Sequence, residues 1–105
     1  MECNSFFRSF RTEAAEEVEK GIRITSLSLG AHRMRRMVFE PKSLIPSHRH
    51  PEDVVTLILE GTMEMTVGGE TRMIGSGDVF LVPAETDHHG CILNEEVVAV
   101  SFSRE

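Results

Sequence analysis

The chain has 105 residues, of which 40% are hydrophobic and 27% charged, and its formal net charge is −6. This length and composition indicate one globular domain with a single core, not a disordered or fibrous chain. The negative charge argues against a nucleic-acid or anionic-membrane partner, because phosphate binding needs clustered Lys and Arg. The one basic cluster, Arg33, Arg35 and Arg36, is short.

The N-terminal residues are expected to form an arm, residues 1–21. Residues 1–12 mix the phenylalanines Phe6, Phe7 and Phe10 with arginines at no clear period, which indicates a segment that orders by packing on the domain or on a partner subunit. Residues 12–20 contain good helix formers and many acidic residues, so they fit either a short helix or an acidic loop.

The start of the chain lacks the apolar run of a secretory signal, and no later apolar run approaches the roughly 20 residues that span a bilayer. We therefore expect a cytoplasmic protein with no membrane partner. Because thiols stay reduced in that compartment, Cys3 and Cys91 are expected to form no structural disulfide.

From residue 22 onward the pattern becomes that of β-strands. Short segments alternate apolar and polar residues or are continuously apolar, and Gly, Pro, Asn and Asp separate them. Gly68 and Gly69 have the composition of a two-residue hairpin turn. Short strands without long helical patterns between them predict an all-β sandwich or barrel. The predicted strands are residues 22–29, 34–39, 54–59, 62–67, 70–74, 78–82, 89–93 and 97–102.

Two histidines lie two residues apart just before an apolar strand pattern. Alternate residues of a strand share a face, so His48 and His50 should project side by side, and imidazole is the commonest ligand for transition metals. Residues 77–89 have the same form: a turn, a strand, a proline and then histidine. They offer His88 as a third ligand, whereas His89 should point the opposite way.

The first stretch resembles one of the two motifs of the cupin superfamily, whose members are small jelly-roll barrels. His48, His50 and Gly61 fit that motif, but Val54 stands where relatives place a Glu or Gln ligand.

The second stretch resembles the other cupin motif. Gly77, Pro83 and His88 fit it, and Glu85 replaces a glycine. The resemblance covers nearly the whole chain and implies an all-β fold, a single double-stranded β-helix (jelly-roll) cupin barrel over residues 22–105.

The resemblance also implies a metal site. By this resemblance, the side chains of His48, His50 and His88 would converge inside one barrel and hold a divalent transition metal ion. Fe, Mn, Ni or Zn would each fit such a site. Val54 cannot coordinate, so either water fills the fourth position or Asp53 does so through a local backbone irregularity. Open positions on such a metal suit binding an oxygen donor or activating water.

Among cupins the chain is similar to short single-barrel enzymes that open uronate rings. In those enzymes proton transfer is assigned to an aspartate two residues before a phenylalanine near the C-terminus. The corresponding pair here is Val100 and Phe102, and valine cannot exchange protons. The shared segments are residues 20–23, 48–51, 59–61 and 103–105.

Three classes of function follow from these residues. The first is a metal-dependent enzyme acting on a small oxygen-rich ligand, such as a sugar acid. The second is a metal- or sugar-binding module without turnover, which Val54 and Val100 support. The third is a structural barrel without bound metal. A ligand-responsive transcription factor is disfavoured because no helix-turn-helix segment is visible.

Residues 54–59 are almost continuously apolar, which predicts a central strand covered on both faces. One barrel interior covers only one of those faces, and an open sandwich leaves sheet edges to protect. We therefore expect a homodimer in which the arm carrying Phe6, Phe7 and Phe10 supplies cover.

Overall fold

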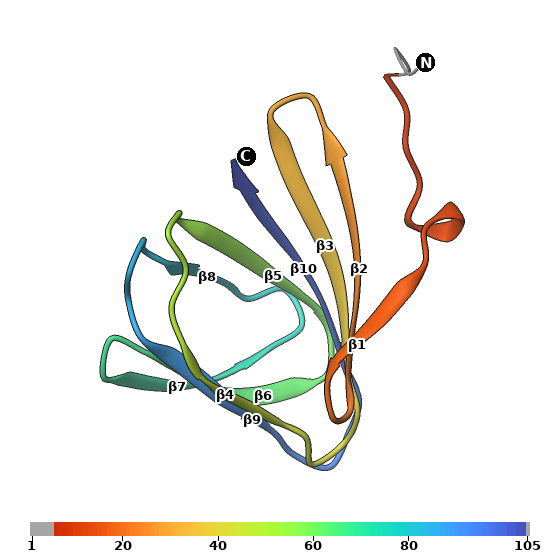
Figure 1. The fold of residues 1–105 in the computed structure, drawn as a ribbon. Helices are drawn as coiled ribbons and strands as arrows, with labels where there is room; N and C mark the ends of the chain where they lie inside the picture. The colour runs from red at the N-terminus through yellow and green to blue at the C-terminus, as the bar shows by residue number, and fades with distance from the viewer. Residues whose placement is uncertain (1–5, 105) are drawn as a thin grey trace.

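The computed structural model describes residues 6–104, which form β-strands and a single turn of 3-10 helix (Figure 1). The elements are η1 (Phe10–Thr12), β1 (Ala15–Glu19), β2 (Ile22–Leu29), β3 (His32–Phe39), β4 (Leu44–His48), β5 (Val54–Glu60), β6 (Thr62–Val67), β7 (Glu70–Gly75), β8 (Val79–Val82), β9 (His88–Ile92) and β10 (Val97–Arg104).

The strands form two antiparallel sheets that face each other (Figure 1). The larger sheet has the order β1-β2-β3-β10-β5-β8, and the smaller has the order β4-β9-β6-β7. Strands distant in sequence are therefore neighbours: β10 lies between β3 and β5, and β9 lies between β4 and β6. The predicted all-β jelly-roll barrel is confirmed, and its crossovers place the end of β4 beside the start of β9.

The core fills one end of the space between the sheets. In the larger sheet Phe39 pairs with both Ile22 and Val97, and in the smaller sheet Met63 pairs with Ile92. The buried apolar cluster consists of Ile22, Phe39, Ile58, Met63, Met65, Ile92, Val97 and Ala99. Because β9 has Ile92 at its last position and His88 at its first, the histidines lie toward the opposite end of the barrel from the core.

Most predicted strands are present, and the hairpin prediction is confirmed. Gly68 and Gly69 have φ angles of 56° and 87°, the left-handed values that a tight hairpin turn requires and that glycine adopts without steric cost. They join β6 to β7, with Val67 paired to Glu70. Strand β4 was not among the predicted strands.

Residues 15–19 form a strand, so the helix and loop predictions for this segment are both wrong. Strand β1 pairs with β2 at the edge of the larger sheet, and all five of its side chains are exposed. Its acidic residues bury no apolar face, and backbone pairing with β2 overrides their helical propensity. Gly21, with φ 81°, makes the turn between the two strands.

The described residues of the arm before β1 cover little of the barrel. Phe6 and Phe7 are 86% and 84% exposed, and η1 contacts β2. Residues 1–5 lie outside the described part of the chain, and with them Cys3, while Cys91 is a free thiol on β9. Among the elements of residues 6–104 there is no helix long and apolar enough to cross a bilayer.

Strand β5 is covered on one face only. Val54, Thr56 and Ile58 are buried toward the other sheet, whereas Val55 and Leu59 on the outer face are 39% and 41% exposed. Within the single chain one face is covered, as expected for one barrel interior, and cover of the other face stays a prediction. Its apolar outer face remains available for a partner.

Candidate metal centre

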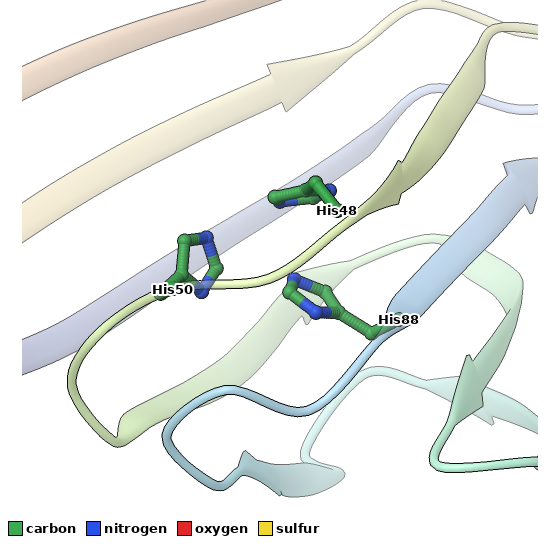
Figure 2. Close-up of side chains that lie close together, drawn as sticks. All are labelled: His48, His50 and His88. Atoms are coloured by element: carbon green, nitrogen blue, oxygen red, sulfur yellow. The ribbon is translucent and has the colours of Figure 1, made fainter.

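Three histidines gather at the wide end of the barrel. His48 ends β4 and pairs with His88, the first residue of β9, and His50 lies in the loop between β4 and β5. One candidate ligand atom from each ring lies within 4.8 Å of the others. Figure 2 shows the three rings turned toward a common space. Among residues 6–104 no other group of three or more His, Cys, Asp or Glu residues has this spacing.

Backbone carbonyls set the proton positions on two of these rings. Nδ1 of His48 lies 2.8 Å from the carbonyl oxygen of Pro46, and Nδ1 of His88 lies 3.1 Å from that of Thr86. A carbonyl oxygen only accepts, so each Nδ1 donates its proton and each Nε2 keeps a free lone pair. This second hydrogen bond orients a histidine for metal ligation.

His50 has a different environment. Its Nδ1 is buried and has no hydrogen-bond partner within the described residues, whereas buried polar atoms are nearly always paired. A metal ion among the three rings would fit this donor set, because His50 is otherwise left with an unsatisfied nitrogen.

Burial keeps the inner histidines neutral. Desolvation lowers the pKa of His50, and the nearby His88, His48 and Arg35 lower it further. Desolvation also lowers the pKa of His88, with its hydrogen bond to the Thr86 carbonyl acting in the opposite direction. Both imidazoles are therefore neutral at pH 7, the form that a metal ligand requires.

Two contacts join the loops that carry the histidines. The amide N–H of Glu85 donates to the carbonyl oxygen of His50 at 2.6 Å, and Nε of Arg49 donates to Oδ1 of Asp87 at 2.9 Å. Glu85 has φ 59°, the left-handed region that costs a non-glycine residue about 1–2 kcal/mol. This explains why the cupin motif resembled by this stretch has glycine here: the position needs that backbone conformation.

Asp53 is placed away from the histidine group. Its Oδ1 accepts a hydrogen bond from the amide N–H of Ala84 at 2.8 Å, and its side chain is exposed. The neighbouring Val54 is buried and lines the same cavity as the three histidines. Val54 therefore presents an apolar side chain to this cavity, and the Asp53 carboxylate joins its loop to Ala84.

A cavity of about 330 Å³ extends from the histidines between the two sheets. Its walls are mainly apolar, and the polar side chains on the larger sheet are Glu19, Arg35, Thr56 and Ser101. The sequence alone showed Arg35 only as part of a short basic cluster with Arg33 and Arg36. The signal that could have found it is the alternation of Arg35, Met37 and Phe39, since all three line the cavity.

Val100 does not face this cavity. Its neighbours Ala99 and Ser101 line the cavity, and Val100 is not among the lining residues that the structure describes. His89 is likewise exposed, on the opposite side of β9 from the buried His88. Ser101 therefore faces the cavity, whereas Val100, the position at which the resemblance placed the proton-transfer residue, does not.

The structure is similar to solved cupins. The RmlC-like cupin from Shewanella frigidimarina superposes with a TM-score of 0.84 at 20% identity, over 97% of this chain and 93% of that chain. KdgF from Halomonas sp. gives a TM-score of 0.80 at 24% identity, over 98% and 96% of the two chains. The salicylate 1,2-dioxygenase of Pseudoaminobacter salicylatoxidans, in an adduct with gentisate, gives 0.78 at 17% identity, over 84% of this chain and 26% of that chain.

At these identities the structural likeness shows the fold alone. No curated protein sequence matches the chain significantly. Residues 35–102 match the cupin domain, which is more than half of the sequence. The chain therefore belongs to the cupin family.

Proposed function

We propose that the protein binds one divalent transition metal ion through His48, His50 and His88, and that it binds or acts on a small oxygen-rich ligand there. The observation that carries this proposal is the unpartnered, buried Nδ1 of His50 beside two histidines whose Nδ1 protons are held by carbonyls. Imidazole ligands suit Fe, Ni and Zn, and Mn also binds such sites when oxygen donors complete the set.

The chain supplies three neutral ligands and a largely apolar enclosure. A metal held by three imidazoles keeps its positive charge and has open positions, where it can polarise a ligand oxygen or lower the pKa of water. The apolar walls exclude bulk water, and the buried His88 fixes one side of the donor set. A small molecule fits this space, and the salicylate 1,2-dioxygenase relative holds one, gentisate.

Cobalt substitution tests this function. We expect the Co²⁺-loaded protein to show a visible spectrum that changes when oxalate is added, because oxalate oxygens would occupy the open positions. The His50→Ala protein should show neither signal. A cobalt spectrum insensitive to oxalate, acetate and other oxygen donors would contradict an open site, and absence of cobalt binding would contradict the metal site itself.

A ligand-binding module without turnover is the second candidate. Within the described residues the cavity lining contains one carboxylate, Glu19, and that residue lies on the exposed edge strand β1. Among the described residues, no carboxylate other than Glu19 lines the cavity to carry out proton transfer to a ligand there. Turnover of sugar acids or other small acids by the metal-loaded protein would exclude this candidate.

The metal affinities of two variants test which group fills the fourth ligand position. Val54→Gln places an amide oxygen beside the histidines, and replacing a water there without ordering a loop should tighten metal binding about tenfold, about 1.4 kcal/mol. Asp53→Asn keeps the acceptor for the Ala84 amide and should leave affinity unchanged. Calorimetric titration of both variants with one ion decides the matter: weaker binding in Asp53→Asn alone would make Asp53 the ligand.

Metal affinity should fall as pH falls. The pKa values of His50 and His88 are lowered below the ordinary value of about 6.5, so protons compete with the metal only in mild acid. In the metal-free protein the unfolded state binds more protons than the folded state between about pH 6.5 and the lowered pKa values, so stability also falls through that window. Metal occupancy that stays constant well below pH 6 or so would argue against ligation by these histidines.

We further propose that the protein is a homodimer that buries the outer face of β10, β5 and β8. Exposed apolar residues lie together there, since Phe102 pairs with Val55 and Val55 with Leu81. A contiguous apolar face of this kind is uncommon on a monomer. Sedimentation at micromolar concentration should give a dimer, and a monomer would reject the proposal.

A further inference from the structure

A row of polar side chains crosses the inner face of the larger sheet. Arg35 on β3 pairs with Ser101 on β10, and Ser101 pairs with Thr56 on β5. All three residues line the cavity that also contains the histidines. The next inward-facing positions toward the core are apolar, Met37 on β3 and its partner Ala99 on β10. The polar row is therefore a local feature of an otherwise apolar wall.

The polar groups of this row have no partner in the described chain. Ser101 and Thr56 are only 4% and 5% exposed, yet across residues 6–104 neither hydroxyl makes a hydrogen bond, and the Arg35 guanidinium makes no hydrogen bond or ion pair. Their polar atoms are not fully enclosed, because Nδ1 of His50 is the one buried side-chain N or O atom without a partner in the described residues. Two hydroxyls and a guanidinium that open onto one cavity are available to a ligand.

The charge of the row is positive, and Arg35 makes no ion pair within the described residues. Burial is the main cause that lowers the pKa of Arg35, followed by the charge of Arg33, and the charge of Glu52 acts in the opposite direction. Glu19 is the one carboxylate of the described lining and lies on β1, at the edge of the sheet. A partly buried cation without a directly bonded carboxylate favours an anionic ligand.

We propose that Arg35, Ser101 and Thr56 form a carboxylate subsite that anchors a small organic acid, whose other oxygen atoms reach the three histidines. Guanidinium matches the two oxygens of a carboxylate with paired donors, and the two hydroxyls can donate to the same group. The cavity volume of about 330 Å³ lies at the small end of ligand pockets, which limits the acid to a small one. The contact between the other oxygen atoms of the acid and the metal rests on the proposed function. The contact between its carboxylate and the polar row does not.

Carboxylate binding by Arg35→Met tests the subsite. Methionine keeps an unbranched side chain and removes the charge, and Arg36→Met is the matched control because Arg36 is exposed on the same strand. Succinate, glutarate, neutral succinamide and inorganic phosphate would be titrated calorimetrically into metal-loaded and metal-free protein. At least one dicarboxylate should bind wild type and Arg36→Met equally, and Arg35→Met roughly ten- to hundred-fold more weakly, with metal content unchanged in all three.

The outcomes separate the two proposals. Arg35-dependent dicarboxylate binding in protein that takes up no metal would support the subsite and refute the metal site. Equal binding to wild type and Arg35→Met, equal binding of succinamide and succinate, a preference for phosphate, or no acid bound in either form would each overturn the subsite. If Arg35→Met only destabilised the protein, its unfolding curve would shift, but its affinity for the acids would not fall selectively relative to its affinity for succinamide.

Discussion

His50→Ala is expected to weaken divalent metal binding by more than about 100-fold while leaving the barrel folded. Changes to groups that merely support a ligand already cost about 10- to 100-fold in affinity, and this change removes a ligand. The side chain of His50 is half-buried, and its Nδ1 makes no hydrogen bond within the described chain. Its loss should therefore cost little folding energy.

The matched control for this variant is His89→Ala. His89 is exposed on the opposite side of β9 from His88, so its removal should leave metal affinity as in wild type. Titration with Zn²⁺ or Ni²⁺, together with a circular dichroism spectrum, gives both readouts. Wild-type affinity in a folded His50→Ala protein would remove His50 from the site.

Gly61→Ala is expected to lower the free energy of unfolding by about 3 kcal/mol or more. Gly61 lies between β5 and β6 with φ 88°, a conformation that costs other residues about 1–2 kcal/mol. A Cβ atom there would lie 2.4 Å from the carbonyl oxygen of Glu96 and 2.9 Å from Cγ2 of Val97. Overpacking of this kind typically adds about 1–3 kcal/mol, and the Glu96 oxygen is a backbone atom directly before β10, so it cannot move aside like the end of a flexible side chain.

Gly69→Ala separates the two causes. Gly69 has φ 87°, and a Cβ atom there would meet nothing within 4 Å, so this variant should show the backbone cost alone, about 1–2 kcal/mol. Urea unfolding of both variants measures the difference, provided that the m-values agree. Equal losses would mean that the contact with Glu96 relaxes at no cost.

The sequence was sufficient for the fold and for the convergence of His48, His50 and His88. Alternation of apolar residues predicts strands, but it does not say which strands are neighbours. That information came from the resemblance, which implied that the three histidines converge inside one barrel, and the structure pairs the end of β4 with the start of β9. Without it, two histidines in one strand and one distant histidine would have been separate observations.

The remaining features depend on contacts that local patterns do not encode. Strand β1 forms because β2 offers a free backbone edge, and its exposed acidic residues carry no periodic signal. Arg35 was one member of a short basic cluster in the sequence, and only the strand register shows that it lies beside Ser101. Asp53 was a reasonable ligand by spacing, but the amide N–H of Ala84, distant in the chain, accounts for its carboxylate.

Elemental analysis of protein purified without a histidine tag tests the central claim most directly. A site made of three neutral imidazoles should retain about one divalent transition metal ion per chain after purification at neutral pH, and the His50→Ala protein prepared in parallel should retain almost none. Wild-type protein that contains no Fe, Mn, Ni or Zn, and that takes up none of them when they are added, would contradict the claim that this barrel is a metal-binding cupin.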